Sequence, residues 1–329
     1  MLQNISRSVI FGGGRGAIIM RCLIVGGTGF LGKNLVRGLL KENHEVVVYA
    51  RDYNKLHEVK CYFEKVEVIC GDFSKETDFE SALNGVDCVF FLISATGPAN
   101  KNLELDFAQN VMPSFALFDC CARKGIKLVF FSSGGTVYGE PQYLPIDEMH
   151  PTNPICAYGM SKMILERTLE YYRVMYGLDY LVLRISNPYG LGQEPARRQG
   201  VIAVFLAHVL TEKEIEIWGN GETVRDYIFV DDLVEVCVKM MSYQGDERIF
   251  NIGSGKGVTL NEILTVIRML TRKEIHVIYK EKRMQDVKSN ILDISKIKCE
   301  MDWYPATSLY DGIQCMSKAW DSQREQFGF

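Results

Sequence analysis

The stretch Cys22-Leu-Ile-Val-Gly-Gly-Thr-Gly-Phe-Leu-Gly32 decides the fold of the chain. Its first four residues are small or apolar, which is typical of a strand buried on both faces of a parallel sheet. Apolar residues then recur at spacings of three and four between Leu31 and Leu40, which predicts a helix directly after the glycines. A strand that enters a helix through closely spaced glycines can bind the pyrophosphate of a dinucleotide at the helix N-terminus. An ordinary turn between a strand and a helix is the alternative.

The composition is that of a soluble globular protein with a large core in one or two lobes. Of the 329 residues, 47% are hydrophobic and 24% are charged, and the net charge of −4 gives no indication of nucleic-acid binding. The ten cysteines form no C-x-x-C pair and the five histidines have no metal-ligand spacing, so we expect reduced thiols, no metal site and a cytoplasmic location. No apolar run is long enough to span a membrane.

Residues 1–20 contain a second group of glycines, between Gly12 and Gly16, which no helical pattern follows. The segment lacks the long apolar core and the small-residue cleavage site of a signal peptide. We therefore expect it to be a disordered leader, or the product of translation upstream of a start at Met20.

Further strands alternate with helical patterns along the first half of the chain. The expected strands cover residues 45–49, 66–69, 86–93, 127–131 and 179–184. This alternation predicts an α/β fold with a doubly wound parallel sheet, the Rossmann architecture, over residues 21–186. The alternation then weakens, so residues 187–329 are expected to form a smaller α/β substrate-binding lobe, with a segment near 227–252 returning to the sheet.

Tyr158 and Lys162 carry the predicted chemistry. They are four residues apart at the start of an expected helix, which puts both side chains on one face. A phenol with its usual pKa of about 10 is a poor acid or base at neutral pH, and we expect an ammonium one turn away to bring that pKa toward the working range. Tyr158 could then exchange a proton with a carbinol oxygen. The alternative is a chance pairing, because a Tyr and a Lys one turn apart occur on many helices.

These motifs, in this order, resemble the extended short-chain dehydrogenase/reductases that act on nucleotide sugars, the NAD-dependent epimerase/dehydratase family, and within it the UDP-glucose 4-epimerase-like branch. The resemblance covers residues 21 to about 320. The matching motifs are Gly26-x-x-Gly29-x-x-Gly32, Gly71-Asp72, Ser132-Ser133 with Val137-Tyr-Gly139, Tyr158-x-x-x-Lys162, Arg184 with Asn187-Pro-Tyr-Gly190, Val224-Arg-Asp-Tyr-Ile228, and residues 293–303.

The resemblance implies roles for individual residues. A nicotinamide dinucleotide would contact Asp72 with its adenine and Lys162 with its nicotinamide ribose. Asn187, Arg225 and Arg283 would hold the diphosphate of the nucleotide sugar, and Asp286 would orient its ribose. Two guanidinium groups suit a diphosphate, since each can form a bidentate bond to phosphate. The turn residues expected to contact the cofactor are Gly26, Thr28, Gly29, Phe30, Leu31 and Gly32.

Two departures from the family pattern bear on function. Where family epimerases usually end the second strand in an acid that binds the adenosine ribose of NAD, this chain has Ala50 followed by Arg51. Loss of a carboxylate beside a guanidinium favours the 2′-phosphate of NADP(H), with NAD(H) as the alternative if Asp52 reaches the ribose instead. The second departure is Gly134, at the usual position of a catalytic hydroxyl, so Ser133 or Thr136 is expected to supply that group.

Three functions follow from these expectations. The first is an NADPH-dependent reductase of the 4-keto group of a nucleotide-linked deoxyhexose, such as a dTDP-4-dehydro-6-deoxyhexose, which the resemblance links to surface-polysaccharide precursors. The second is an NAD-dependent 4-epimerase of UDP-glucose or UDP-N-acetylglucosamine. The third is a non-catalytic nucleotide-binding module, which the intact pair of Tyr158 and Lys162 disfavours.

A homodimer is the expected assembly. The helical segments at residues 103–121 and 158–176 carry apolar residues on more than one face. The sheet can cover only one side of each helix, so a two-fold partner is expected to cover the other in a four-helix bundle, as in proteins that this chain resembles. Coverage by the second lobe or by the leader is the alternative.

Overall fold

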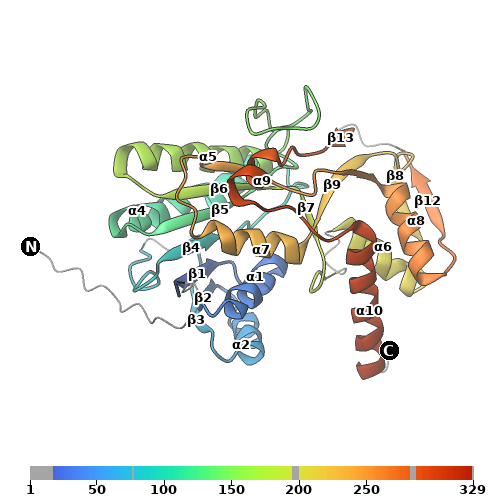
Figure 1. Ribbon diagram of the computed structural model, residues 1–329, viewed down its shortest axis with the longest axis horizontal. Coiled ribbons are helices and arrows are strands. Elements are labelled where there is room, and N and C mark those ends of the chain that lie inside the picture. The colour runs from blue at the N-terminus through green and yellow to red at the C-terminus, as the bar shows by residue number, and fades with distance from the viewer. Residues whose placement is uncertain (1–17, 76–77, 195–199, 282–286, 328–329) are drawn as a thin grey trace, which may run out of the picture.

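The computed structural model describes residues 18–75, 78–194, 200–281 and 287–327. Its centre is a parallel sheet of seven strands in the order β10-β6-β5-β4-β1-β2-β3 (Figure 1). The predicted doubly wound parallel sheet is confirmed. Its strands are β1 (Arg21–Val25), β2 (Glu45–Ala50), β3 (Glu67–Cys70), β4 (Cys88–Phe91), β5 (Lys127–Ser133), β6 (Tyr180–Ile185) and β10 (Ile249–Ile252).

Helices cover both faces of this sheet. One face packs against α1 (Phe30–Lys41), α2 (Tyr53–Tyr62) and α7 (Val230–Met240), and the other against α4 (Ser114–Lys124) and α5 (Ala157–Tyr176) (Figure 1). Each face has its own apolar core, because successive strand residues point to opposite sides. Strand order reverses at β1, so a crevice is expected outside the carboxyl ends of β1 and β4.

The turn between β1 and α1 requires glycine at the helix start. A Cβ atom on Gly32 would lie 2.5 Å from the Cα of Gly27 and 2.6 Å from the carbonyl oxygen of Gly26. No side chain fits in that space, so the first turn of α1 packs directly on the turn that precedes it. Gly29 caps α1 without a side chain, and this leaves the first N–H groups of the helix open to a ligand.

The prediction of a single helix over residues 103–121 is wrong, because the segment is divided into three helical parts. The structure has α3 (Leu103–Asp106), a π-helical turn η1 (Phe107–Val111) and then α4. Met112 donates to the carbonyl of Phe107 over 3.0 Å, which is the five-residue spacing of a π turn. Pro113 follows, and its ring cannot continue the hydrogen-bonding pattern of the first helix.

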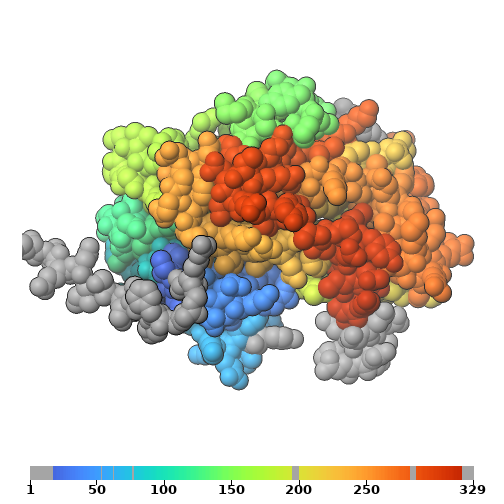
Figure 2. Space-filling view, viewed as in Figure 1, coloured from blue at the N-terminus to red at the C-terminus, as the bar shows by residue number. Residues whose placement is uncertain are grey.

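The second part of the chain builds a smaller unit with its own core beside the sheet (Figures 1 and 2). Helices α6 (Val201–Leu210), α8 (Leu260–Thr271) and α10 (Leu309–Phe327) pack around the strand pair β8 (Ile215–Trp218) and β12 (Val277–Lys280). Strand β9 (Val224–Phe229) pairs with β7 (Asn187–Tyr189), β11 (Gly257–Thr259) and β13 (Ser289–Asn290). The short helix α9 (Ser295–Met301) packs back against β10.

Among the residues that the structure describes, none of the helices combines the length and apolar character needed to cross a bilayer.

Candidate active site

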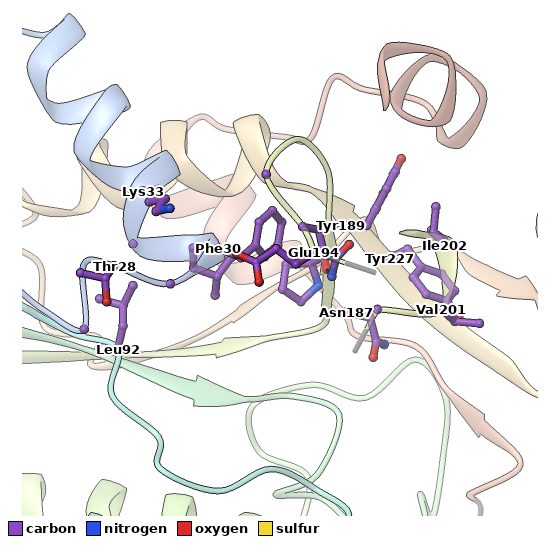
Figure 3. A pocket seen from close by; sticks show the side chains of 18 residues that line it. Thr28, Phe30, Lys33, Leu92, Asn187, Tyr189, Glu194, Val201, Ile202 and Tyr227 are labelled. Atoms are coloured by element: carbon purple, nitrogen blue, oxygen red, sulfur yellow. Dashed lines mark hydrogen bonds between the residues drawn. The ribbon is translucent and has the colours of Figure 1, made fainter. Parts of the chain in front are cut away.

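A cavity of about 500 Å³ opens where the β1–α1 turn meets the second lobe (Figure 3). All six turn residues expected to contact a cofactor line it: Gly26, Thr28, Gly29, Phe30, Leu31 and Gly32. Asn187 lines the opposite wall, and its side-chain amide donates to the carbonyl of Asp226 over 2.8 Å. The cavity therefore joins the expected cofactor turn to one expected substrate residue.

Sequence reasoning missed most of the second-lobe wall of this cavity. The additional lining residues include Lys33 of α1, Tyr189, Glu194, Val201, Ile202 and Tyr227 (Figure 3). The amide of Asn34 donates to the carbonyl of Leu191 over 3.0 Å and so ties α1 to the loop after β7. The sequence after Asn187 is polar, and this does not predict that the loop there contacts α1.

The open N-terminus of α1 fits a dinucleotide. The closely packed glycines allow phosphate groups to approach the backbone, and the helix dipole favours negative charge there. These residues, rather than charged side chains, would hold the pyrophosphate of a nicotinamide dinucleotide.

The expected adenosine end lies at the carboxyl ends of β2 and β3. Arg51 directly follows β2 and its side chain is exposed. The carboxylate of Asp52 accepts from the backbone N–H of Lys55 over 3.2 Å as the N-cap of α2. Asp72 follows β3, and its carboxylate accepts from the hydroxyl of Ser74 over 2.8 Å. Asp52 is therefore already occupied with a structural role, whereas Arg51 is open to a ligand.

Tyr158 and Lys162 lie on one face of α5, as the spacing predicted. The Nζ atom of Lys162 is 5.6 Å from the centre of the Tyr158 ring and donates to the carbonyl of Phe131 over 2.8 Å. It also lies 4.7 Å from the centre of the Phe130 ring. Lys162 is 4% exposed, and Tyr158 is half-buried. A buried ammonium thus stands beside a phenol at the carboxyl end of β5.

The expectation that the pKa of the Tyr158 phenol is lowered is wrong. Burial raises the pKa of the Tyr158 phenol well above its ordinary value, and a hydrogen bond with Ser133 only partly opposes this. Burial also lowers the pKa of Lys162 to about 8, although the Asp106 and Glu166 carboxylates limit that fall. Desolvation is the largest cause of the raised pKa of Tyr158, and the Cys156 thiol and the Asp106 carboxylate add to it. The phenol is protonated at neutral pH.

Packing explains why Gly134 has no side chain. A Cβ atom there would lie 2.6 Å from Cδ1 of Leu292 and 3.0 Å from the carbonyl oxygen of Arg184. The hydroxyl that meets Tyr158 comes instead from Ser133. The hydroxyl of Thr136 is buried and has no hydrogen-bond partner among the described residues. Of the two candidates from the sequence, only Ser133 is brought into contact with the phenol.

This contact leads to a prediction for the two hydroxyls. Ser133→Ala should lower turnover about tenfold or more, because the phenol loses its hydrogen-bond partner at the reacting oxygen. Thr136→Val should change turnover much less, since its hydroxyl makes no such contact. Steady-state rates of both variants, with melting temperatures as a check on folding, test this. A larger loss of turnover in Thr136→Val than in Ser133→Ala would show that Thr136, and not Ser133, supplies the catalytic hydroxyl.

The remaining expected substrate residues are not all brought to the cavity. Arg225 is half-buried on β9 and donates to the carbonyl of Val224 over 2.8 Å, but it does not line the cavity. Arg283 and Asp286 lie outside the described residues. The diphosphate contacts of Arg225 and Arg283 and the ribose contact of Asp286 stay predictions.

A separate group of acidic side chains and a thiol lies away from this cavity. Asp78, Glu80 and Cys120 bring potential metal-ligand atoms within 4.8 Å of one another. Glu80, however, is paired with Arg123 at 2.8 Å and with Lys124 at 2.7 Å. Two cationic side chains thus already neutralise the Glu80 carboxylate.

Comparison with known proteins agrees with this geometry. The profile of the NAD dependent epimerase/dehydratase family matches residues 22–253. A putative UDP-glucose 4-epimerase of Methanocaldococcus jannaschii is 32% identical over 299 residues, covering 89% of this chain and 95% of that protein. A dTDP-4-dehydro-6-deoxyglucose reductase of Escherichia coli is also 32% identical, over 305 residues, covering 90% of this chain and 96% of that protein.

Among solved structures, UDP-glucose 4-epimerase of Thermotoga maritima with UDP-glucose matches with a TM-score of 0.85. The two chains are 31% identical, and the match covers 92% of this chain and 99% of the other. The chain is therefore similar over nearly its whole length both to epimerases and to a reductase.

Proposed function

The chain belongs to the NAD-dependent epimerase/dehydratase family, and from this premise we propose that it is an NADPH-dependent reductase of the 4-keto group of a nucleotide-linked deoxyhexose. A dTDP-4-dehydro-6-deoxyhexose is the proposed type of substrate, because the Escherichia coli relative is a dTDP-4-dehydro-6-deoxyglucose reductase by name. A bound nicotinamide dinucleotide would supply the reducing equivalent. The chain's own residues would bind and orient the two nucleotides and provide the proton.

The exposed Arg51 at the end of β2 carries this proposal. Directly after β2 the described chain has Ala50, Arg51 and then Asp52, whose carboxylate caps α2. A guanidinium beside an otherwise neutral strand end suits the 2′-phosphate of NADP(H), whereas an epimerase of this family uses NAD. NADPH as the cofactor favours a single reduction over a reversible epimerisation.

The protonated state of Tyr158 suits the proton-donor role that the proposed reduction requires. Reduction of a ketone to an alcohol needs a proton at the carbonyl oxygen, and a neutral phenol can donate it. Burial keeps the pKa of Tyr158 high, so the proton is present at neutral pH. Ser133 would share the substrate oxygen with Tyr158, and Lys162 would bind the nicotinamide ribose.

The second candidate is a UDP-sugar 4-epimerase that uses NAD. The matches to the Methanocaldococcus jannaschii and Thermotoga maritima proteins, both UDP-glucose 4-epimerases by name, favour it. It needs the same pair of Tyr158 and Lys162, so these residues do not separate the two activities.

One experiment separates the candidates. Protein denatured directly after purification is examined by mass spectrometry for released nucleotide, and fresh protein is then assayed with two substrate pairs. We expect NADPH oxidation with dTDP-4-dehydro-6-deoxyglucose, and either an empty site or NADP. Tightly bound NAD with interconversion of UDP-glucose and UDP-galactose would overturn the reductase in favour of the epimerase. The absence of nucleotide and of turnover under every condition would favour a non-catalytic module.

A dimer through α4 and α5 is proposed for the assembly. A groove between these helices is lined by Phe115, Ile164, Arg167, Thr168, Tyr171 and Tyr172. Two further apolar side chains are exposed, Met112 just before α4 at 60% and Met175 on α5 at 57%. Apolar surface of this kind on two neighbouring helices suits a two-fold partner.

We expect light scattering to give twice the mass of one chain at micromolar concentration. Tyr171→Glu should shift the protein toward the monomer, because it adds a charge to the groove. Tyr304→Glu is the matched control, since Tyr304 is also an exposed tyrosine but lies away from α4 and α5. A wild-type monomer at micromolar concentration would contradict the dimer.

A further inference from the structure

Asp106 is a completely buried carboxylate at the end of α3, beside the catalytic helix α5. Its oxygens accept from the Thr96 hydroxyl at 2.6 Å, the Asn100 amide at 3.0 Å and the Asn110 amide at 2.8 Å. Burial alone would favour the neutral acid, but these donors outweigh it and hold the pKa of Asp106 below its ordinary value. The side chain is therefore a buried negative charge held only by neutral donors in the described part of the chain.

The other buried carboxylate near Lys162 is already paired. Glu166 lies one turn further along α5, and its oxygen is 2.6 Å from Nη2 of Arg184 on β6. Both side chains of this ion pair are almost completely buried, at 3% and 5% exposure. Arg184 thus neutralises Glu166, and Asp106 is left as the carboxylate without a bonded cation among the described residues.

The groups that face the Lys162 ammonium can be named element by element. Asp106 is buried at the end of α3, which packs against α5, and its negative charge acts on the buried Lys162 ammonium, while Glu166 and the neutral Tyr158 lie with Lys162 on α5. Strand β5 contributes the carbonyl of Phe131, and β6 contributes Arg184, which is bonded to Glu166. A buried ammonium needs an opposite charge to offset its lost hydration. Of these two carboxylates, Asp106 is the one with no ion pair in the described part of the chain, and its charge also raises the pKa of the neighbouring Tyr158 phenol.

We propose that Asp106 is the counter-charge of Lys162, a positioning residue that keeps the lysine protonated and held beside Tyr158. The inference rests on the proposed function, in which Lys162 acts as a charged group. It adds a residue that no sequence motif indicated, because α3 comes next to α5 only in the folded chain. It also gives the loop before α3 a role, since Thr96 and Asn100 hold Asp106 in place.

The test is an NMR titration of Lys162 in the protein without added cofactor or substrate. Protein labelled with ¹³C at the lysine ε-carbon is titrated, and the Lys162 signal is assigned by its absence from Lys162→Met. We expect a wild-type midpoint near the lowered pKa of about 8. Asp106→Asn should move the midpoint down by about one pH unit or more, because an opposite charge is lost.

Thr96→Val is the matched control. It removes one neutral hydrogen bond to Asp106 and keeps the charge, so the Lys162 midpoint should stay at its wild-type value. An Asp106→Asn midpoint equal to that of the wild type would overturn the proposal. The titration uses no turnover, so failure of the proposed activity and failure of this inference give different results.

A second measurement covers the case in which Asp106→Asn folds but is too unstable for the titration. If Asp106 balances Lys162, the double variant Asp106→Asn with Lys162→Met should melt at a higher temperature than Asp106→Asn alone, because no unpaired ammonium is left in the interior. A double variant that is as unstable as the sum of the single losses would show that Asp106 serves only the loop, and the proposal would fail.

Discussion

Tyr158→Phe is expected to lower turnover by about 10²- to 10⁴-fold while leaving cofactor binding nearly unchanged. The substitution removes the proton donor and keeps the ring, so the contacts of the half-buried side chain survive. The phenol is proposed to transfer a proton only, and that contribution is lost completely. Steady-state kinetics with the 4-keto nucleotide sugar, beside calorimetric titration of NADPH, measure the two effects separately. Unchanged turnover would remove Tyr158 from the mechanism.

Lys162→Met should affect both cofactor binding and turnover, in contrast to Tyr158→Phe. The lysine is proposed to bind the nicotinamide ribose and to act as a charge beside Tyr158, so its loss should weaken cofactor binding as well as rate. The wild-type rate should also fall as the pH rises above about 8, because Lys162 then loses its proton. A Lys162→Met variant with normal cofactor affinity would show that the lysine serves the proton chemistry alone.

The sheet could be predicted from sequence because its signals are local. Expected strands at residues 45–49 and 127–131 correspond to β2 and β5. Buried parallel strands are short apolar runs bounded by turn residues, and these runs can be read without knowing their neighbours. The pairing of Tyr158 and Lys162 on one face of α5 was equally a matter of spacing within one element.

The features that could not be predicted depend on contacts between distant segments. The predicted direction of the Tyr158 pKa shift was wrong because the folded chain removes the phenol from water and places the Asp106 carboxylate near it, and both raise its pKa. The choice between Ser133 and Thr136 needed the folded positions of both hydroxyls, since Ser133 bonds to the Tyr158 phenol and the buried Thr136 hydroxyl has no partner among the described residues. Asp106 had no signal, since nothing in its own segment shows that it faces α5. Sequence spacing predicts which residues share a face, and only packing decides how strongly they interact.

Cofactor choice is the second large expected effect, because the proposed reductase depends on it. If Arg51 binds the 2′-phosphate, its charge-assisted hydrogen bonds exist only with NADP(H), and each should contribute about 1.5–3 kcal/mol. At about 1.4 kcal/mol for each factor of ten, Arg51→Ala should weaken NADPH binding about ten- to a hundredfold. The affinity for NADH should hardly change, since NADH has no 2′-phosphate. Titration of both cofactors into the wild type and the variant measures this.

The reverse variant, Ala50→Asp, tests the same site from the opposite direction. It returns a carboxylate to the end of β2, where it can accept from the ribose hydroxyls of NAD(H) and repel a 2′-phosphate. Asp52 should not compensate in either variant, because its carboxylate caps α2. If the wild type prefers NADH and Arg51→Ala leaves both affinities unchanged, Arg51 is only a solvent-exposed residue. The argument for NADP(H) then fails, and the 4-epimerase, which needs the same Tyr158 and Lys162, becomes the better proposal.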